Sequence, residues 1–199
     1  MVVKLYRAKE NTYRKKLGSV SPPLYPNEML VKICSSEGYS KLTCNLFNKK
    51  LNVCEIGSFA GNNLRFFLNN GHNVYGVEIN KYLLQLCNKY LKTFKIKKKP
   101  KLLVGNNLSI PLPKKTLDLF ISINTIHYNT GEKISLAIEN FKSLVKKNGI
   151  IIIETPGPKH MIFKKSKKIK NLVYKFKLPF NDHREGINMG LFDNETQIT

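Results

Sequence analysis

The fold is decided by the stretch LNVCEIGSFAGNN, residues 51–63. Its first six residues are mostly apolar and predict a buried strand over 51–56. Gly57 and Gly61 follow, and glycine lets the backbone turn sharply and approach a ligand closely. The next residues predict a helix over 62–70, which Gly71 ends from the position just after the helix C-cap. The stretch therefore predicts one step of a β-α alternation.

The alternation continues along the chain. Apolar periodicity predicts further elements, and Asn80 is a suitable N-cap for one of the helices. The predicted strands cover residues 73–78, 101–104, 117–123 and 150–153, and the predicted helices cover 81–92 and 132–147, the latter stopped by Gly149. Two short helices, interrupted near Gly38, are expected within 27–47. Strands alternating with helices predict an α/β fold with a doubly wound, mostly parallel sheet and helices on both faces.

Length and composition limit the class of protein. The 199 residues suit one domain, and no apolar stretch approaches the roughly 18 residues that cross a bilayer. Residues 1–17 contain no apolar block of the signal-peptide type. The cysteines form no CxxC pair, so we expect no zinc or other metal site, no disulfide framework, and buried reduced thiols in a cytoplasmic protein. The four cysteines are Cys34, Cys44, Cys54 and Cys87.

The formal net charge of +21 is the most unusual number in the composition. It favours anionic partners such as nucleic acids by long-range attraction, whatever the fold. Lys, Asn and Ile are all abundant, however, and a compositional bias acting on the whole chain produces the same charge without selection for nucleic-acid binding. Both interpretations stay open.

The spacing of the first turn helps to identify its ligand. A dinucleotide fingerprint needs three glycines in GxGxxG, and two of those positions are occupied by Phe59 and Asn62. Read as acidic-x-Gly-x-Gly-x-Gly, the same turn supplies Glu55, Gly57 and Gly61, and only Phe59 departs. This pattern resembles the motif that opens class I S-adenosylmethionine-dependent methyltransferases, which have a Rossmann-like fold. The resemblance implies S-adenosylmethionine as the cofactor and places residues 55, 57, 58, 59 and 61 against it, namely Glu55, Gly57, Ser58, Phe59 and Gly61.

Three later segments extend the resemblance. Glu78 ends the second strand, where the family holds both ribose hydroxyls with a carboxylate, and Ile79 follows it. The segment GNNLSIPL, residues 105–112, is similar to the family's Gly-Asp-Ala-x-x-Leu-Pro-Phe, with Asn106 replacing the aspartate that accepts the adenine amino proton and Asn107 beside it. The segment after the fourth strand is similar to the loop that faces the methionine end of the cofactor, which implies a contact from Asn124.

The resemblance covers about residues 25–158, ending with LVKKNGIIIIETPGP, residues 144–158, which is similar to the helix, turn and strand that close the family's parallel core. YPNE, residues 25–28, also resembles the segment before the first strand in some members that act on small molecules. We therefore divide the chain into a basic arm, 1–26, a cofactor-binding core, 27–158, and a basic acceptor-side segment, 159–199. The family's carboxyl-terminal strands are expected to be short or missing.

Candidate residues for binding the acceptor and for catalysis lie after the fourth strand and near the carboxyl end. A sulfonium already activates its methyl group, so such an enzyme mainly aligns an acceptor and excludes water. A base can assist, and His127 is the candidate because it follows the fourth strand; the weaker candidates are His160, Asp182, His183 and Glu185. The lysines of residues 164–177 surround Phe163, Val173, Tyr174 and Phe176, which suits either phosphate binding with base stacking or a solvated helix face with a buried apolar side.

Three functions follow from these patterns. A small-molecule methyltransferase is favoured because INTIHY, residues 123–128, lacks the Asn/Asp-Pro-Pro-Tyr element of enzymes that methylate exocyclic base amines. An RNA methyltransferase is supported by charge alone. A non-catalytic binding module that retains the fold is suggested by Phe59 and by the short carboxyl end.

Overall fold

A computed structural model of the chain describes residues 23–36, 38–40, 43, 47–170, 173–176 and 188–190. Backbone contacts divide the chain into two units. The larger unit comprises Pro22–Ile126 and Ser135–Glu154. The described part of the smaller unit lies within residues 127–134 and 155–190.

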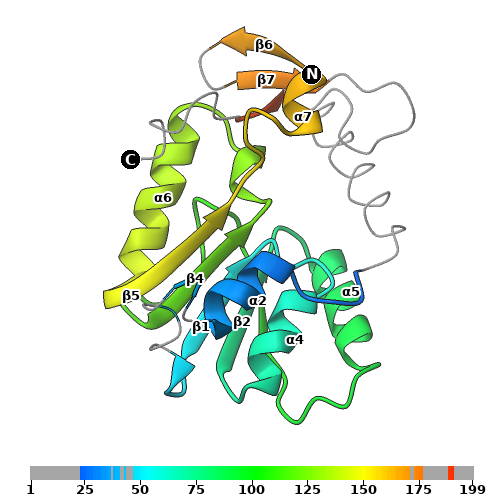
Figure 1. Cartoon of the computed structure of the whole chain (residues 1–199), viewed down its shortest axis with the longest axis vertical. Helices are drawn as coiled ribbons and strands as arrows, with labels where there is room; N and C mark the ends of the chain where they lie inside the picture. Colours follow the sequence, from blue (N-terminus) through cyan, green and yellow to red (C-terminus); the bar gives the residue numbers. More distant parts are fainter. Residues whose placement is uncertain are drawn as a thin grey trace. The chain divides into compact units, whose positions relative to one another are not determined.

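A five-stranded parallel sheet forms the centre of the larger unit (Figure 1). Its strands are β1 (Asn52–Ile56), β2 (Asn73–Glu78), β3 (Lys101–Val104), β4 (Leu117–Ile123) and β5 (Val145–Glu154). Their order is β3-β2-β1-β4-β5, and all four neighbouring pairs are parallel. The chain thus reverses its direction of winding beside β1, which confirms the predicted doubly wound α/β fold.

The helices of this unit cover both faces of the sheet. Leu119 and Ile121 of β4 share a buried cluster with Leu64 of α4, whereas Phe120 between them stacks on Phe141 of α6 with ring centroids 4.4 Å apart. Because successive strand residues point to opposite faces, α4 and α6 lie on opposite sides. The helices of this unit are α2 (Glu28–Ser35), α4 (Asn62–Asn69), α5 (Lys81–Leu91) and residues 135–144 of α6 (Glu132–Leu144). The 3-10 turn η1 (Ile126–Tyr128) begins at the last residue of the stretch Pro22–Ile126 and continues in the smaller unit.

Local capping explains where the helices start and stop. Asn80 accepts a hydrogen bond from the Leu83 amide at 2.9 Å, as predicted for an N-cap. Asn27 caps α2 in the same way through the Leu30 amide at 2.8 Å. Gly71 follows α4 with φ +81°, in agreement with the predicted left-handed stop. The second predicted helix within residues 27–47 lies largely outside the described residues.

The predicted helix over 132–147 is three residues too long. Helix α6 ends at Leu144, and β5 begins at Val145 and runs to Glu154. Leu117 pairs with Val145 but Leu119 pairs with Ile150, so β5 carries extra residues in a bulge. Gly149 lies in this bulge, after the helix has already ended at Leu144, so it does not stop the helix. A Cβ on Gly149 would lie 3.1 Å from the Asp118 carbonyl oxygen, so the close approach to β4 favours glycine there. Val145 fits the apolar stripe of the helix and the buried side of the strand equally well, which is why periodicity misplaced the boundary.

The smaller unit contains a short helix and a three-stranded antiparallel sheet. Its elements are α7 (Met161–Lys164), β6 (Ser166–Lys170), β7 (Val173–Phe176) and β8 (Asn188–Met189), in the order β6-β7-β8. Ile162, Tyr174, Phe176 and Met189 form its buried cluster. The solvated helix face weighed for residues 164–177 is therefore wrong for β6 and β7, because Lys175 is exposed between two buried aromatic residues, as in a strand.

The side chains of Cys34, Cys54 and Cys87 are buried, as expected, and that of Cys44 lies outside the described residues. Asp182, His183 and Glu185 also lie outside them. Among the described residues, no helix combines the length and apolar character needed to cross a membrane.

Candidate functional site

A pocket of about 440 Å³ opens at the carboxyl ends of β1 and β4, where doubly wound sheets bind ligands. Four segments line it: the chain before α2, the turn after β1, the start of α4 and the end of β4. The lining residues are Pro23, Tyr25, Pro26, Asn27, Glu55, Gly57, Ser58, Phe59, Asn62, Asn63, Ile123 and Asn124. The structure therefore brings five of the predicted cofactor residues together, Glu55, Gly57, Ser58, Phe59 and Asn124.

Glycine is required in the turn after β1. Gly57 has φ +75°, and a Cβ on it would lie 2.2 Å from Thr125 Oγ1. Gly61 has φ +79°, and a Cβ there would lie 2.7 Å from Cys87 Sγ. Phe59, between them, also has a left-handed backbone, with φ 43°. A side chain at that φ costs about 1–2 kcal/mol, so the residue that departs from the family pattern sits where glycine is favoured.

Glu78 connects the end of β2 to this turn. Its Oε1 accepts a hydrogen bond from the Phe59 amide at 2.9 Å, and its Oε2 accepts one from the Ile79 amide at 3.0 Å. The side chain is buried. A carboxylate oxygen can accept more than one hydrogen bond, so both oxygens retain the capacity to accept hydroxyl protons.

Glu55, which lines the pocket, is a second buried carboxyl group. Asn63 Nδ2 donates to its Oε1 at 2.6 Å, while its Oε2 and the Ser58 hydroxyl have no hydrogen-bond partner among the described residues. Burial raises the pKa of Glu55 to about 8, the Asn63 hydrogen bond lowers it, and the charge of Glu78 raises it. The group is therefore mostly protonated at neutral pH and can donate as well as accept a hydrogen bond.

Asn27 connects the segment before α2 to α4 and to the end of β5. Its Nδ2 donates to both carboxylate oxygens of Glu154, at 3.1 and 3.3 Å, and its backbone amide donates to Asn63 Oδ1 at 2.8 Å. Asn124 Nδ2 donates to Glu154 Oε1 at 3.1 Å. Sequence reasoning gave no role to Asn63 or Glu154. The available signals were a polar residue on the inner side of α4 and a carboxylate directly after four isoleucines.

Several predicted residues do not line this pocket. Asn106 is exposed, and its Oδ1 accepts from the amides of Leu108 and Ser109 at 2.9 and 3.1 Å, which closes a turn. Asn107 is buried, and its carbonyl oxygen accepts from Asn140 Nδ2 at 2.9 Å. The remaining residues outside the lining are Gly61, Glu78 and Ile79. The cofactor contacts of all these residues stay predictions.

The candidate base, His127, lies in η1 within the smaller unit. Its side chain is 2% exposed, its ring centroid is 4.6 Å from that of Tyr128, and its carbonyl oxygen accepts from the Gly190 amide at 2.8 Å. His160 caps α7, because its Nδ1 accepts from the Ile162 amide at 3.1 Å. No group of three or more His, Cys, Asp or Glu residues in the described part of the chain is placed to hold a metal ion.

Comparisons with known proteins agree with this geometry. A family model described as a methyltransferase domain matches residues 54–153. An uncharacterized methyltransferase of Geobacillus sp. (strain WCH70) is 30% identical over 100 residues, which are 50% of this chain and 45% of that protein. The chain spans about half the length of the curated relatives it matches.

Solved structures share the fold. A protein of Pyrococcus horikoshii has a TM-score of 0.66 and 17% identity, covering 94% of this chain and 85% of that one. A SAM-dependent methyltransferase of Methanosarcina mazei also has a TM-score of 0.66, with 15% identity over 79% of this chain and 80% of that one. At these identities the similarity shows the architecture of the chain.

Proposed function

Because this chain belongs to the methyltransferase-domain family, we propose that it transfers the methyl group of S-adenosylmethionine to a small-molecule acceptor. The observation that carries the proposal is the 2.9 Å hydrogen bond between the Phe59 amide and Glu78 Oε1. It joins the glycine turn after β1 to the carboxylate that ends β2, beside a pocket of suitable size for a ligand. These are the two elements expected to hold the cofactor.

The residues present suit S-adenosylmethionine. Gly57 keeps the turn open where any side chain would meet Thr125. Glu78 supplies carboxylate oxygens for ribose hydroxyls, and charge-assisted hydrogen bonds of this kind are about twice as strong as neutral ones. The buried Glu55 Oε2 and Ser58 hydroxyl, which lack partners among the described residues, are available for polar groups of the cofactor. Leaving such groups unsatisfied costs about 1–3 kcal/mol each, which a polar ligand would recover.

The bound cofactor would supply an electrophilic methyl group on a sulfonium. The protein's own task is then to orient the acceptor and to keep water away. Tyr25, Pro26 and Asn27 form one wall of the pocket, and Asn27 is anchored by Glu154. We assign to this wall the exclusion of water. His127 stays our candidate for removing an acceptor proton, on the ground of its place after the fourth strand in the sequence.

A small-molecule acceptor is supported by residues 123–128, because they lack the Asn/Asp-Pro-Pro-Tyr element of enzymes that methylate exocyclic base amines. An acceptor RNA has only net charge in its favour, and we do not adopt it. A binding module without turnover is the second candidate, because Phe59 places a large side chain at φ 43° in the middle of the cofactor turn.

Calorimetric titration with S-adenosylmethionine tests the proposal, with NAD as the comparison ligand. We expect micromolar binding of S-adenosylmethionine, no heat with NAD, and at least tenfold weaker binding for Glu78→Gln. Glu28→Gln is the matched control, because Glu28 is an exposed carboxylate on α2 paired with Lys32. A folded protein that gives no heat with S-adenosylmethionine would contradict the proposal.

A second step separates the two candidates. The protein is incubated with radiolabelled S-adenosylmethionine and either a metabolite extract or total RNA. Label in a metabolite supports the small-molecule methyltransferase. Tight cofactor binding without transfer to either pool supports the binding module, and label in RNA contradicts the proposed acceptor class.

A further inference from the structure

Lysines gather at the amino ends of the strands, away from the pocket. In a parallel sheet all amino ends lie at one edge, and ligands of the fold bind beyond the other edge. Lysines lead into β1, β3 and β4 and occupy the start of β5. They are Lys49, Lys50, Lys97, Lys98, Lys99, Lys114, Lys115, Lys146 and Lys147, all exposed, and together they are called the lysine face.

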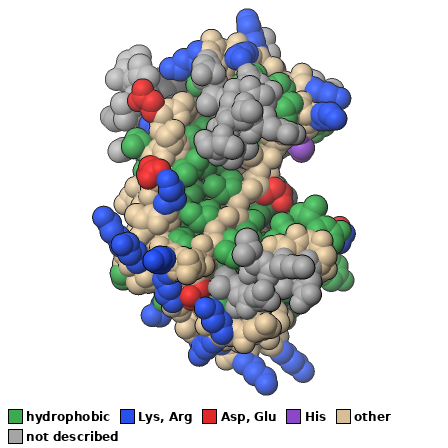
Figure 2. Space-filling model, turned by 60° about the vertical axis from the view of Figure 1, so that its left-hand side comes forward, with side chains coloured by type: hydrophobic (Ala, Val, Ile, Leu, Met, Phe, Trp, Pro, Cys, Tyr) green, Lys and Arg blue, Asp and Glu red, His purple; other side chains and the backbone are tan. Residues whose placement is uncertain are grey.

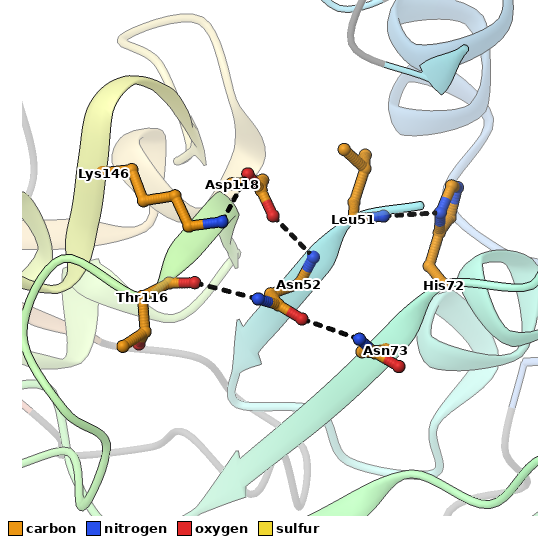
Figure 3. Close-up of polar contacts among 7 residues, drawn as sticks. All are labelled: Leu51, Asn52, His72, Asn73, Thr116, Asp118 and Lys146. Atoms are coloured by element: carbon orange, nitrogen blue, oxygen red, sulfur yellow. Dashed lines mark hydrogen bonds and ion pairs between the residues drawn. The ribbon is translucent and has the colours of Figure 1, made fainter. Parts of the chain in front are cut away.

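Hydrogen bonds tie the segments of the lysine face together (Figure 3). Asn52 is the centre: its Nδ2 donates to the Thr116 carbonyl oxygen at 3.1 Å, and its Oδ1 accepts from Asn73 Nδ2 at 2.8 Å. Asp118 connects β1 to β5. One of its carboxylate oxygens accepts from the backbone amide of Asn52 at 2.8 Å, and the other accepts from Lys146 Nζ at 2.9 Å. The amino ends of β1, β2, β4 and β5 therefore form one continuous support.

Lysines from separate segments come close on this support. Lys98 Nζ donates to Asn73 Oδ1. Partial desolvation and the charge of Lys50 both lower the pKa of Lys98, so the ammonium groups of these residues, 48 positions apart in sequence, are near neighbours. Burial tends to raise the pKa of Asp118, but hydrogen bonds from Asn52 and Lys146 and the charges of Lys146 and Lys49 hold it below its ordinary value.

The positive charge of this surface is poorly balanced. Asp118 is the sole acidic residue in the segments 49–52, 95–101, 113–118 and 145–149. Its side chain is 11% exposed and already pairs with Lys146. Figure 2 shows Lys and Arg side chains along the lower left of the view, with a further group at the top. Concentrated like charge repels itself and raises the local concentration of anions.

We propose that the lysine face binds the phosphate backbone of a nucleic-acid duplex. Neutralising phosphates needs only positive charges in a suitable array. Single strands are held in addition by stacking on aromatic side chains, and the four segments above contain no Phe, Tyr or Trp. The surface is built at the opposite edge of the sheet from the pocket, so the inference does not rest on the proposed methyl transfer.

Fluorescence anisotropy with labelled 20-base-pair RNA and DNA duplexes of random sequence tests the inference. Lys50→Gln, Lys97→Gln, Lys99→Gln and Lys147→Gln are combined in one variant. The matched control combines Lys81→Gln, Lys89→Gln, Lys133→Gln and Lys159→Gln, which are exposed lysines outside the lysine face. Both variants lose the same net charge, so a difference in their affinity for the duplex depends on where the substituted lysines lie. Circular dichroism checks that both are folded.

The lysine-face variant is expected to bind duplex at least tenfold more weakly than the control. Its plot of log affinity against log salt should be shallower by about 3.6, because each of the four lost phosphate contacts removes about 0.9 from the slope. Equal weakening in both variants would overturn the inference, since binding would then follow net charge. Tighter binding of a labelled poly-glutamate peptide than of either duplex would also overturn it and indicate an acidic protein partner.

Discussion

The backbone amide of Phe59 donates a hydrogen bond to Glu78 Oε1 across 2.9 Å. The contact joins the turn after β1 to the end of β2 through a residue whose backbone is left-handed, with φ 43°. The position of the amide therefore depends on a conformation that phenylalanine disfavours. Strain of this kind persists only where surrounding contacts enforce it, and Glu78 is one of those contacts.

The strain at Phe59 can be measured by comparing two truncations. Phe59→Ala and Phe59→Gly both lose the ring, but only alanine keeps a Cβ at positive φ. We expect Phe59→Gly to be more stable than Phe59→Ala by about 1 kcal/mol, the usual cost of a side chain in the left-handed region. Urea unfolding gives both values. Equal stabilities, or a more stable alanine variant, would show that the turn relaxes without cost.

Gly57 and Gly71 separate backbone strain from steric exclusion. Both have positive φ, +75° and +81°, but a Cβ on Gly57 would lie 2.2 Å from Thr125 Oγ1, whereas one on Gly71 has nothing within 4 Å. Gly71→Ala should cost about 1 kcal/mol, and Gly57→Ala should cost about 1–3 kcal/mol more because the turn must also move. Chemical denaturation of both variants measures the difference. If the two substitutions cost the same, Thr125 yields and the turn is not closed to a side chain.

Local patterns were sufficient for most of the fold. The strands and helices around the glycine turn were predicted within one residue of their observed ends. Each has a short periodic apolar pattern, and the helices are bounded by residues such as Gly71 after α4 and Asn80 before α5. Membership of the methyltransferase-domain family likewise confirms the resemblance to class I S-adenosylmethionine-dependent methyltransferases that was drawn from the turn.

Features that depend on neighbours in space were not predictable. The bulge of β5 arises from pairing with β4, which no pattern within residues 145–154 reveals. Glu154 joins the site through hydrogen bonds from Asn27 and Asn124, and Asn63 accepts one from the Asn27 amide, although Asn27 is far from both in sequence. A single sequence carries no record of these long-range contacts.

The double role of Asn27 leads to a prediction about the pocket wall. Its Oδ1 caps α2, and its Nδ2 binds Glu154. Asn27→Ser retains a capping oxygen but loses the amide donor, whereas Asn27→Ala loses both. We expect the serine variant to be about 1 kcal/mol more stable than the alanine variant, and both to bind S-adenosylmethionine more weakly than the wild type. Thermal unfolding and calorimetry measure the two effects. Wild-type affinity in the serine variant would show that Glu154 does not position the wall.

Glu55 gives the protein a distinctive dependence on pH. Burial raises the pKa of Glu55 to about 8 in the folded state, against 4.5 for an ordinary glutamate. Between these values the folded protein holds a proton that the unfolded chain has released, so the contribution of Glu55 to stability falls as pH rises from about 4.5 to about 8. Glu55→Gln keeps an oxygen to accept from Asn63 Nδ2 but cannot ionise.

We therefore expect Glu55→Gln to unfold near the wild-type temperature at pH 5 and at least about 3 °C higher at pH 8.5, since 1 kcal/mol moves the midpoint of a domain this size by about 2–4 °C. Differential scanning calorimetry across this range measures both midpoints. Glu28→Gln is the control, because an exposed carboxylate paired with Lys32 on the helix surface should give no gain that grows with pH. A constant difference between Glu55→Gln and the wild type at all pH values would mean that Glu55 is ionised throughout, with its charge stabilised by groups other than Asn63.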